Sequence, residues 1–423
     1  MNRTLVVRTL SFWLAPSTLV LGATGDAAPS LAEFRIMQEH LRALSDRVQR
    51  LEAANVELAA QLLERSSASV AASQTAPAAS GEQAIPKWHE RLSWNGDLRL
   101  RHEDSHQEGA EARSRERLQT HFGLKAAVTD DLEVGLQLAT GGDDPRSANQ
   151  TMTGESSRKS VGLDLAYLSW QILDEVNLTG GKMKYPFYRP ALSKLYDGDI
   201  NPEGLALSFD QSGFFGSTYA FWLEERSADA ETTLVGAQTG FRHRLSGTST
   251  FTASVSYSDL GAGQGRRPFH DGEPNGNTLT DSGTLAYDFR VLQGTLELDT
   301  ALRRLPVRLY FDYARNEAAP AGLDSAYSTG FLLGTKSGPH GWEFGYLHQK
   351  IEKDAWFGQF SDSDFGAGLT DSEGDILRIA YSPVTSSLVS ATYYMNDLFI
   401  SVPKAVRPPD DNRILQLDFL FTF

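Results

Sequence analysis

Arginines at alternate positions are the strongest chemical pattern in this sequence. Arg99 and Arg101 alternate with Leu98 and Leu100. The second group, one segment later, consists of Arg113, Arg115 and Arg117, followed by the apolar Leu118 and Phe122. Side chains of an extended strand point alternately to its two faces. The spacing therefore predicts a ladder of five arginines on one face of two neighbouring strands.

Two interpretations of this arginine ladder are open. Five guanidinium groups facing water could line a passage and favour anions locally. Alternatively, they could pair with Asp97, Glu103 and other acids and only stiffen the wall, because burying like charges without partners is costly.

Further charged residues fall on the polar faces of other predicted strands, and five are candidates for the same lumen: Arg308, Arg378, Asp164, Asp312 and Glu343. Acidic and basic groups on opposite walls would set up a field across the lumen. Such a field favours dipolar or charged solutes.

The segment 184–203 combines charged, aromatic and proline residues and is predicted to narrow that lumen. Its charged candidates are Lys184, Arg189, Lys194, Asp197 and Asp199. Folding inward and lying on the outer rim are both possible placements. Asp197, Asp199, Asn201 and Glu203 alternate like calcium ligands, but Pro202 occupies the position where a calcium loop needs glycine. Asp362 and Asp364 are expected to form a solvated acidic tip.

Catalysis, cofactor binding and a metal site are not expected. The sequence holds no HExxH, no phosphate-binding glycine loop and no Gly-x-Ser-x-Gly elbow. It has no cysteine, and its 9 histidines are scattered. The formal net charge of -15 argues against nucleic acid as a partner, since phosphate backbones bind to basic surfaces.

The elements that must position these residues are strands, because apolar residues recur with period two from position 88 to 423. Clear examples are Leu132, Val134, Leu136 and Leu138, and then Val161, Leu163, Leu165 and Tyr167, with polar or small residues between them. Short turns alternate strictly with long polar segments along this region. That alternation is typical of transmembrane barrels and predicts an antiparallel up-and-down β-barrel of about 16 strands.

The last residues support the same architecture. Leu415, Leu417, Phe419, Phe421 and Phe423 share one face, as expected of a closing strand that faces lipid. Chain ends of soluble proteins are usually polar and frayed.

Three segments precede the predicted barrel. Residues 1–27 have the arginines, apolar run and small residues of a signal peptide. Residues 30–65 carry a heptad pattern, and 66–87 form an Ala/Ser/Pro-rich linker. The heptad positions predicted to mediate oligomerisation include Leu41, Leu44, Val48, Leu51, Asn55 and Leu58. A single amphipathic helix is the alternative.

The predicted barrel region, 88–423, resembles the Gram-negative putative porin family, whose members carry a heptad segment before the barrel. Four stretches carry this resemblance. They are 138–151 (LATGGDDPRSANQT), 163–170 (LDLAYLSW), 178–187 (LTGGKMKYPF) and 197–209 (DGDINPEGLALSF). The resemblance implies an outer-membrane channel for small solutes, a homotrimer, and recognition of Phe423 by the outer-membrane assembly machinery. A structural tether that contacts the cell envelope through its coiled coil is the alternative function.

Overall fold

The computed structural model describes residues 91–152, 154–190, 192–225, 231–261, 263–269, 273–403, 406 and 410–423. The chain divides into two compact units, 1–85 and 86–423, and the second is the subject of this section. The predicted signal peptide, coiled coil and linker lie outside the described residues. Among the residues that are described, no helix has the length and apolar character to cross a membrane.

Seventeen strands and two short 3-10 helices make up the described part of this unit. The strands are β1 Leu92–Gln107, β2 Arg113–Ala127, β3 Leu132–Thr140, β4 Gln150–Thr151, β5 Val161–Leu173, β6 Val176–Lys182, β7 Glu203–Gln211, β8 Phe214–Glu224, β9 Thr232–Ser246, β10 Ser249–Gly261, β11 Phe289–Leu302, β12 Leu305–Asn316, β13 Ser325–Thr335, β14 Trp342–Ile351, β15 Ser372–Tyr381, β16 Ser387–Leu398 and β17 Asp410–Thr422. The 3-10 helices are η2 Gly358–Phe360 and η3 Phe365–Gly368.

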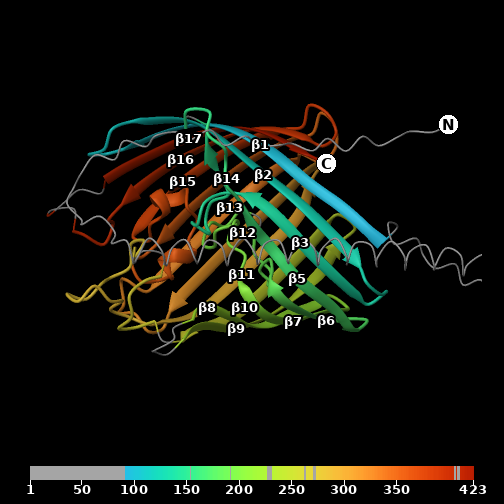
Figure 1. The fold of residues 1–423 in the computed structure, drawn as a ribbon, viewed down its shortest axis with the longest axis horizontal. Helices are drawn as coiled ribbons and strands as arrows, with labels where there is room; N and C mark the ends of the chain where they lie inside the picture. The colour runs from blue at the N-terminus through green and yellow to red at the C-terminus, as the bar shows by residue number, and fades with distance from the viewer. Residues whose placement is uncertain are drawn as a thin grey trace, which may run out of the picture. The chain divides into compact units, whose positions relative to one another are not determined.

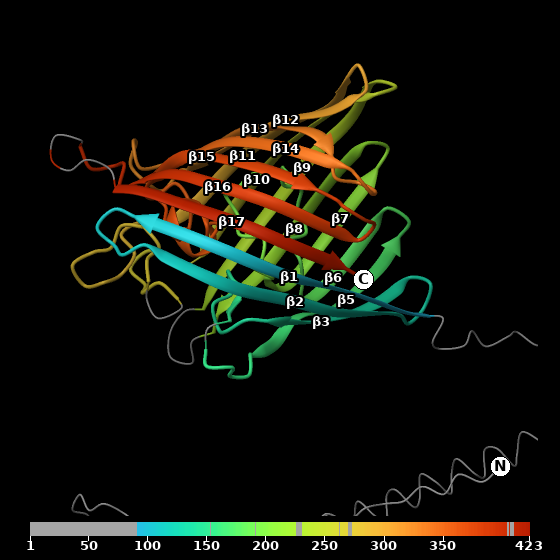
Figure 2. The same ribbon diagram turned by 90° about the horizontal axis from the view of Figure 1, so that it is seen from above.

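Sixteen of these strands close into one antiparallel barrel (Figure 1). Each pairs with its neighbours in the wall, and β1 pairs with β17, so that Leu100 lies opposite both Leu118 of β2 and Phe419 of β17. Figure 2 shows β1 beside β17. The two-residue β4 pairs only with β2 and is not part of the wall's circuit. The prediction of about 16 strands is confirmed.

The outer face of the barrel is apolar between two rings of aromatic residues. Leu98, Leu100 and Phe122 are exposed there, which confirms the outward side predicted for them. The ring near the long loops includes Tyr257, Tyr313 and Tyr393, and the ring near the short turns includes Trp94, Trp170, Phe214, Trp342, Tyr381 and Phe423. A broad apolar band between aromatic girdles is the surface that a bilayer requires of a transmembrane barrel.

One part of the predicted alternation is wrong. In β5 the register shifts opposite Gln137 and Leu138 of β3, which pair with Leu165 and Leu163. Leu163 is therefore exposed on the outer face, whereas Leu165 is buried. The hydroxyl of Tyr167 donates to Glu133 at 3.0 Å. A bulge inserts one residue and reverses the faces beyond it, which period-two counting does not detect.

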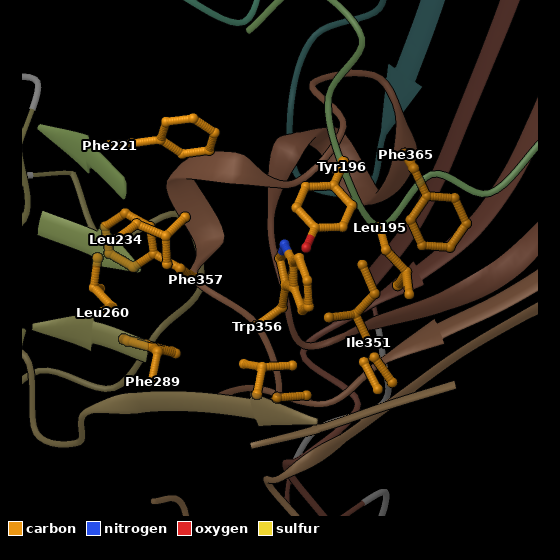
Figure 3. Close-up of a cluster of buried hydrophobic side chains, with 14 of the residues drawn as sticks. Leu195, Tyr196, Phe221, Leu234, Leu260, Phe289, Ile351, Trp356, Phe357 and Phe365 are labelled. Carbon is orange, nitrogen blue, oxygen red and sulfur yellow. The ribbon is translucent and has the colours of Figure 1, made fainter. Parts of the chain in front are cut away.

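Long loops fill much of the barrel. We number them along the chain and use L2 for residues 141–160, L3 for 183–202, L5 for 262–288 and L7 for 352–371. Leu195 and Tyr196 of L3 pack with Trp356, Phe357 and others of L7 (Figure 3). The rest of this apolar cluster comes from inward residues of the wall, including Phe221, Leu234, Leu260, Phe289 and Ile351. The inner face is thus apolar where it meets this cluster.

L5 fixes L7 in this position through polar contacts. Asn277 of L5 donates to the carbonyl oxygens of Lys353 and Trp356, both at 2.9 Å. Thr278 donates through its hydroxyl to Asp354 at 2.6 Å. Because these backbone groups are satisfied by a neighbouring loop, L7 can remain buried without losing hydrogen bonds.

Candidate functional site

L3 crosses the lumen and is anchored to three separate strands. The amide of Tyr188 donates to Gln238 of β9 at 2.7 Å, and the hydroxyl of Ser193 donates to Asp312 of β12 at 2.6 Å. The amide of Lys194 donates to Gln349 of β14 at 3.0 Å. Of the two placements that the sequence left open, L3 therefore adopts the inward one.

The tip of L3 is held by L7. Lys194 forms an ion pair with Asp362, with 2.7 Å between nitrogen and oxygen. Asp197 accepts a hydrogen bond from the amide of Ser363 at 2.8 Å, and its own amide donates to the carbonyl of Phe360 at 2.8 Å. The ring of Tyr196 meets the indole of Trp356 edge-on, with 4.4 Å between centroids (Figure 3). We call these contacts the L3–L7 junction.

Burial changes the protonation of this junction. It raises the pKa of Asp197 to about 8, and the nearby carboxylates of Asp362 and Asp199 act in the same direction. Burial disfavours the charged form of Lys194, but Asp362, Tyr394 and Asp364 together outweigh it and raise the pKa of this lysine above its ordinary value. The lysine stays charged, while Asp197 holds a proton at neutral pH.

Between the loops and the wall lies a gap of about 470 Å³ with a strongly charged lining. Its basic groups are Arg99, Arg101, Lys194, Arg308, Lys336 and Arg378, and its acidic groups are Asp197, Asp199, Glu343, Asp362, Asp364 and Asp418. Every basic group except Lys194 comes from the strands or a short turn, whereas four of the acids come from L3 and L7. A basic wall thus faces acidic loops.

Three arginines of the predicted ladder are paired with acids. Arg101 forms a bidentate pair with Asp418 of β17, at 2.6 and 3.0 Å. Arg115 and Arg117 both bind Glu103, the latter at 3.1 Å. For these three arginines the structure therefore agrees with the interpretation that they pair with acids of the wall. Glu103 binds two of them. Among the described residues Asp97 pairs with no arginine, and it lies 3.0 Å from His121.

Arg99 differs from the other arginines of the ladder. Its Nη2 donates to the side-chain oxygen of Asn149 at 2.8 Å. Among the described residues no carboxylate lies within ion-pair distance of Arg99, and its buried Nε has no hydrogen-bond partner. Arg113 is exposed at the loop end of β2 and does not line the gap. Arg99 thus presents unused donors close to the gap.

Two of the other predicted basic residues line the gap with acidic partners. Arg308 lies 2.6 Å from Asp299 and 3.3 Å from Glu297. Arg378 lies 3.0 Å from Glu343, which also contacts Lys336 at 3.4 Å.

Several predicted residues lie away from the gap. Asp312 is buried beneath Ser193, and Asp164 accepts hydrogen bonds from Gln137 and Asn201. Lys184 is exposed beside a separate small cavity. The guanidinium of Arg189 lies 4.9 Å from the ring of Tyr185, inside the aromatic part of L3. Residues that the sequence assigned to one lumen are therefore separated from the gap in the structure.

The expectation of a solvated tip at Asp362 and Asp364 was wrong. Asp362 is buried, and Asp364 contacts Arg101 at 3.4 Å. The signal that could have placed them is the composition of L7, where Trp356, Phe357 and Phe360 precede the two acids. A solvated tip would not carry so much aromatic surface. Asn149, which binds Arg99, was also missed, because one asparagine in a polar loop carries no sequence signal.

Residues 106–282 match the model of a family described as putative porin. Over this region the chain is similar to the putative porin family. All four stretches that suggested the resemblance lie inside the match, so the resemblance is confirmed. No curated protein matches the sequence.

Solved structures of outer-membrane proteins are similar to this barrel. OprB of Pseudomonas putida, in its high-pH structure, aligns with a TM-score of 0.55 at 11% identity, over 79% of this chain and 95% of that one. A loop-deletion mutant of OmpT from Vibrio cholerae covers 79% of this chain and 100% of its own at 10% identity and a TM-score of 0.47. Family and fold together place the chain in the outer membrane of a Gram-negative bacterium as a porin-type channel protein.

Proposed function

We propose that this porin lets small hydrophilic and charged solutes diffuse passively through the gap between L3, L7 and the wall. The observation that carries this proposal is the charged gap of about 470 Å³, which L3 forms by crossing the lumen. Solute selection in a pore depends on the width and the charge of its narrowest part. The opposition of basic wall and acidic loops favours solutes that are dipolar or charged.

Arg99 supports a local preference for anions at this gap. The other basic groups of the lining are near acids that offset their charge, as Arg101 is by Asp418 and Arg378 by Glu343. Within the described part of the chain, the side chain of Arg99 hydrogen-bonds only to the neutral amide of Asn149. An anion that passes the gap therefore meets one guanidinium whose charge no ion pair offsets.

The test is ion selectivity of the purified protein in planar bilayers. We expect Arg99→Gln to lower the anion-to-cation permeability ratio by about twofold, because charges ~8 Å apart in water interact by about 0.5 kcal/mol. The matched control is Arg113→Gln, which removes the same charge from an exposed position outside the gap. An unchanged reversal potential in Arg99→Gln, or an equal change in both variants, would reject the anion preference.

The assembly of the chain is a separate part of the proposal. We propose a homotrimer in the outer-membrane lipid, joined in part by the heptad segment, with Phe423 read by the assembly machinery. Removing residues 30–65 should then weaken the oligomer in detergent without abolishing conductance. If the same deletion instead detached the protein from the cell envelope, the tether alternative would be favoured.

A further inference from the structure

A second and larger cavity of about 670 Å³ lies on the other side of the aromatic part of L3. Its lining includes Asp174 and Glu175, which form the short turn between β5 and β6, so it opens toward the short-turn end of the barrel. We call it the vestibule. None of the charged groups that line the gap also lines the vestibule.

One side of the vestibule is aromatic. L3 contributes Tyr185, Phe187 and Tyr188, and β8 contributes Phe215. The centroids of Tyr188 and Phe215 are 5.6 Å apart. The guanidinium of Arg242 lies 4.2 Å from the centroid of the Phe215 ring. Phe215 is buried with Arg242 over its ring, whereas Tyr185, Phe187 and Tyr188 are half-buried and leave part of each ring available for contact with a solute.

The other side of the vestibule carries amide side chains with fixed orientations. Gln238 exchanges two hydrogen bonds with the backbone of Tyr188, at 2.7 and 3.0 Å. Asn177 is held by the hydroxyl of Ser169, which lies 3.0 Å from its oxygen and 2.9 Å from its nitrogen. Gln238 is buried, and the amide nitrogen of Asn177 donates to both Ser169 and Thr179, so the remaining hydrogen-bonding capacity is that of the Asn177 oxygen.

The charges of the vestibule disfavour an anionic solute. Arg242 is paired with Asp210 at 2.6 Å, and the remaining charged groups of the lining are Asp174 and Glu175. A purely apolar solute would also be disfavoured, because it would cover the amides without replacing their hydrogen bonds to water. A ligand that fits both sides has a flat C–H surface for the rings and several hydroxyl groups for the amides.

We propose that the vestibule binds a neutral sugar of one or two rings. A pyranose ring offers an apolar face that can stack on the half-buried tyrosine and phenylalanine rings of L3, while one of its hydroxyls can donate to the oxygen of Asn177. The volume lies within the range of small-molecule sites. This inference rests on the proposed channel, since the sugar reaches the vestibule through the lumen.

The test is single-channel recording with maltose added on the side of the short turns. In the wild-type protein we expect maltose to reduce the current in a saturable way. Tyr188→Leu and Asn177→Leu should each raise the half-saturating maltose concentration by about fivefold. The matched control is Tyr393→Leu, a tyrosine on the outer face of β16. A polyethylene glycol of similar size measures the effect of volume alone.

The outcomes separate this inference from the proposed function. A wild-type protein that does not conduct overturns both. A conducting protein in which maltose acts no more strongly than polyethylene glycol overturns the sugar site alone. Saturable block that both vestibule variants retain unchanged also overturns it. If Tyr188→Leu fails to fold, the Asn177→Leu comparison decides.

Discussion

At the scale of single residues, the buried carboxylate of Glu103 organises the arginine ladder. Its side chain is only 2% exposed and binds both Arg115 and Arg117, with Arg101 at 3.9 Å and Gln416 at 3.2 Å. Three cations converge on one acid because alternate positions of β1 and β2 face the same lumen. An acidic residue, Glu103, therefore holds the arginines of the ladder together.

Replacing this acid should be much more costly than replacing an exposed one. We expect Glu103→Gln to destabilise the barrel by about 3–5 kcal/mol, because the arginines around it would remain buried with less opposite charge. Glu116→Gln is the control, since Glu116 is exposed on the outer face and pairs there with His102. Urea unfolding in detergent micelles measures both. Equal stability of the two variants would contradict the argument.

At the scale of elements, L3 determines the cross-section of the lumen. Its anchors at Ser193 and Lys194 hold it to β12 and β14 across the barrel. We expect deletion of residues 190–196 to raise single-channel conductance about twofold, because the open area of a 16-stranded barrel is limited by what fills it. Ser193→Ala, which removes one anchor and leaves the loop in place, is the control. Unaltered conductance after the deletion would exclude L3 as the constriction.

The L3–L7 junction should become weaker as pH rises. The folded protein holds the pKa of Asp197 at about 8, above its ordinary value of 3.8. Between these values the folded state keeps a proton that the opened state releases, so opening becomes easier as pH increases from about 4 to 8 and then stays constant. Below about pH 4 the contribution of this group to junction stability is fully present.

Hydrogen exchange of L3 measures this dependence. After correction for the intrinsic effect of pH, exchange at residues 193–199 should accelerate between pH 5 and 8 in the wild-type protein. Asp197→Asn, which cannot ionise, should lose this additional acceleration. Asp281→Asn changes an exposed aspartate of L5 and should retain it. A pH dependence that persists in Asp197→Asn would assign it to another group.

At the scale of the whole molecule, the barrel places its apolar surface outside and its charges inside. The closing contact is made at the chain end, where Phe423 exchanges two backbone hydrogen bonds with Gly96, both at 2.9 Å. The outward residues of β17 then continue the apolar surface of β1. The whole band faces hydrocarbon, in which an unpaired charge is costly.

A charge introduced into this band should therefore act on membrane stability and leave the lumen unchanged. We expect Leu309→Arg, on the outer face of β12, to destabilise the folded barrel in lipid by about 2–4 kcal/mol. Val384→Arg is the control, because Val384 is exposed in the short turn between β15 and β16. Unfolding in liposomes compares the two. Similar losses in both variants would argue against a lipid-facing Leu309.

The sequence alone determined the barrel, its strand number, the position of nearly every connection and the face of the arginine ladder. These follow from local rules, since strand residues alternate between faces and turns interrupt the alternation. Tertiary structure decided which charges meet. Arg101 pairs with Asp418, 317 positions away, and Asp364 reaches the ladder from L7. Such pairings depend on barrel closure and on loops that fold inward to bury aromatic surface, and the bulge in β5 changes faces without a period-two signal. No local pattern encodes either effect.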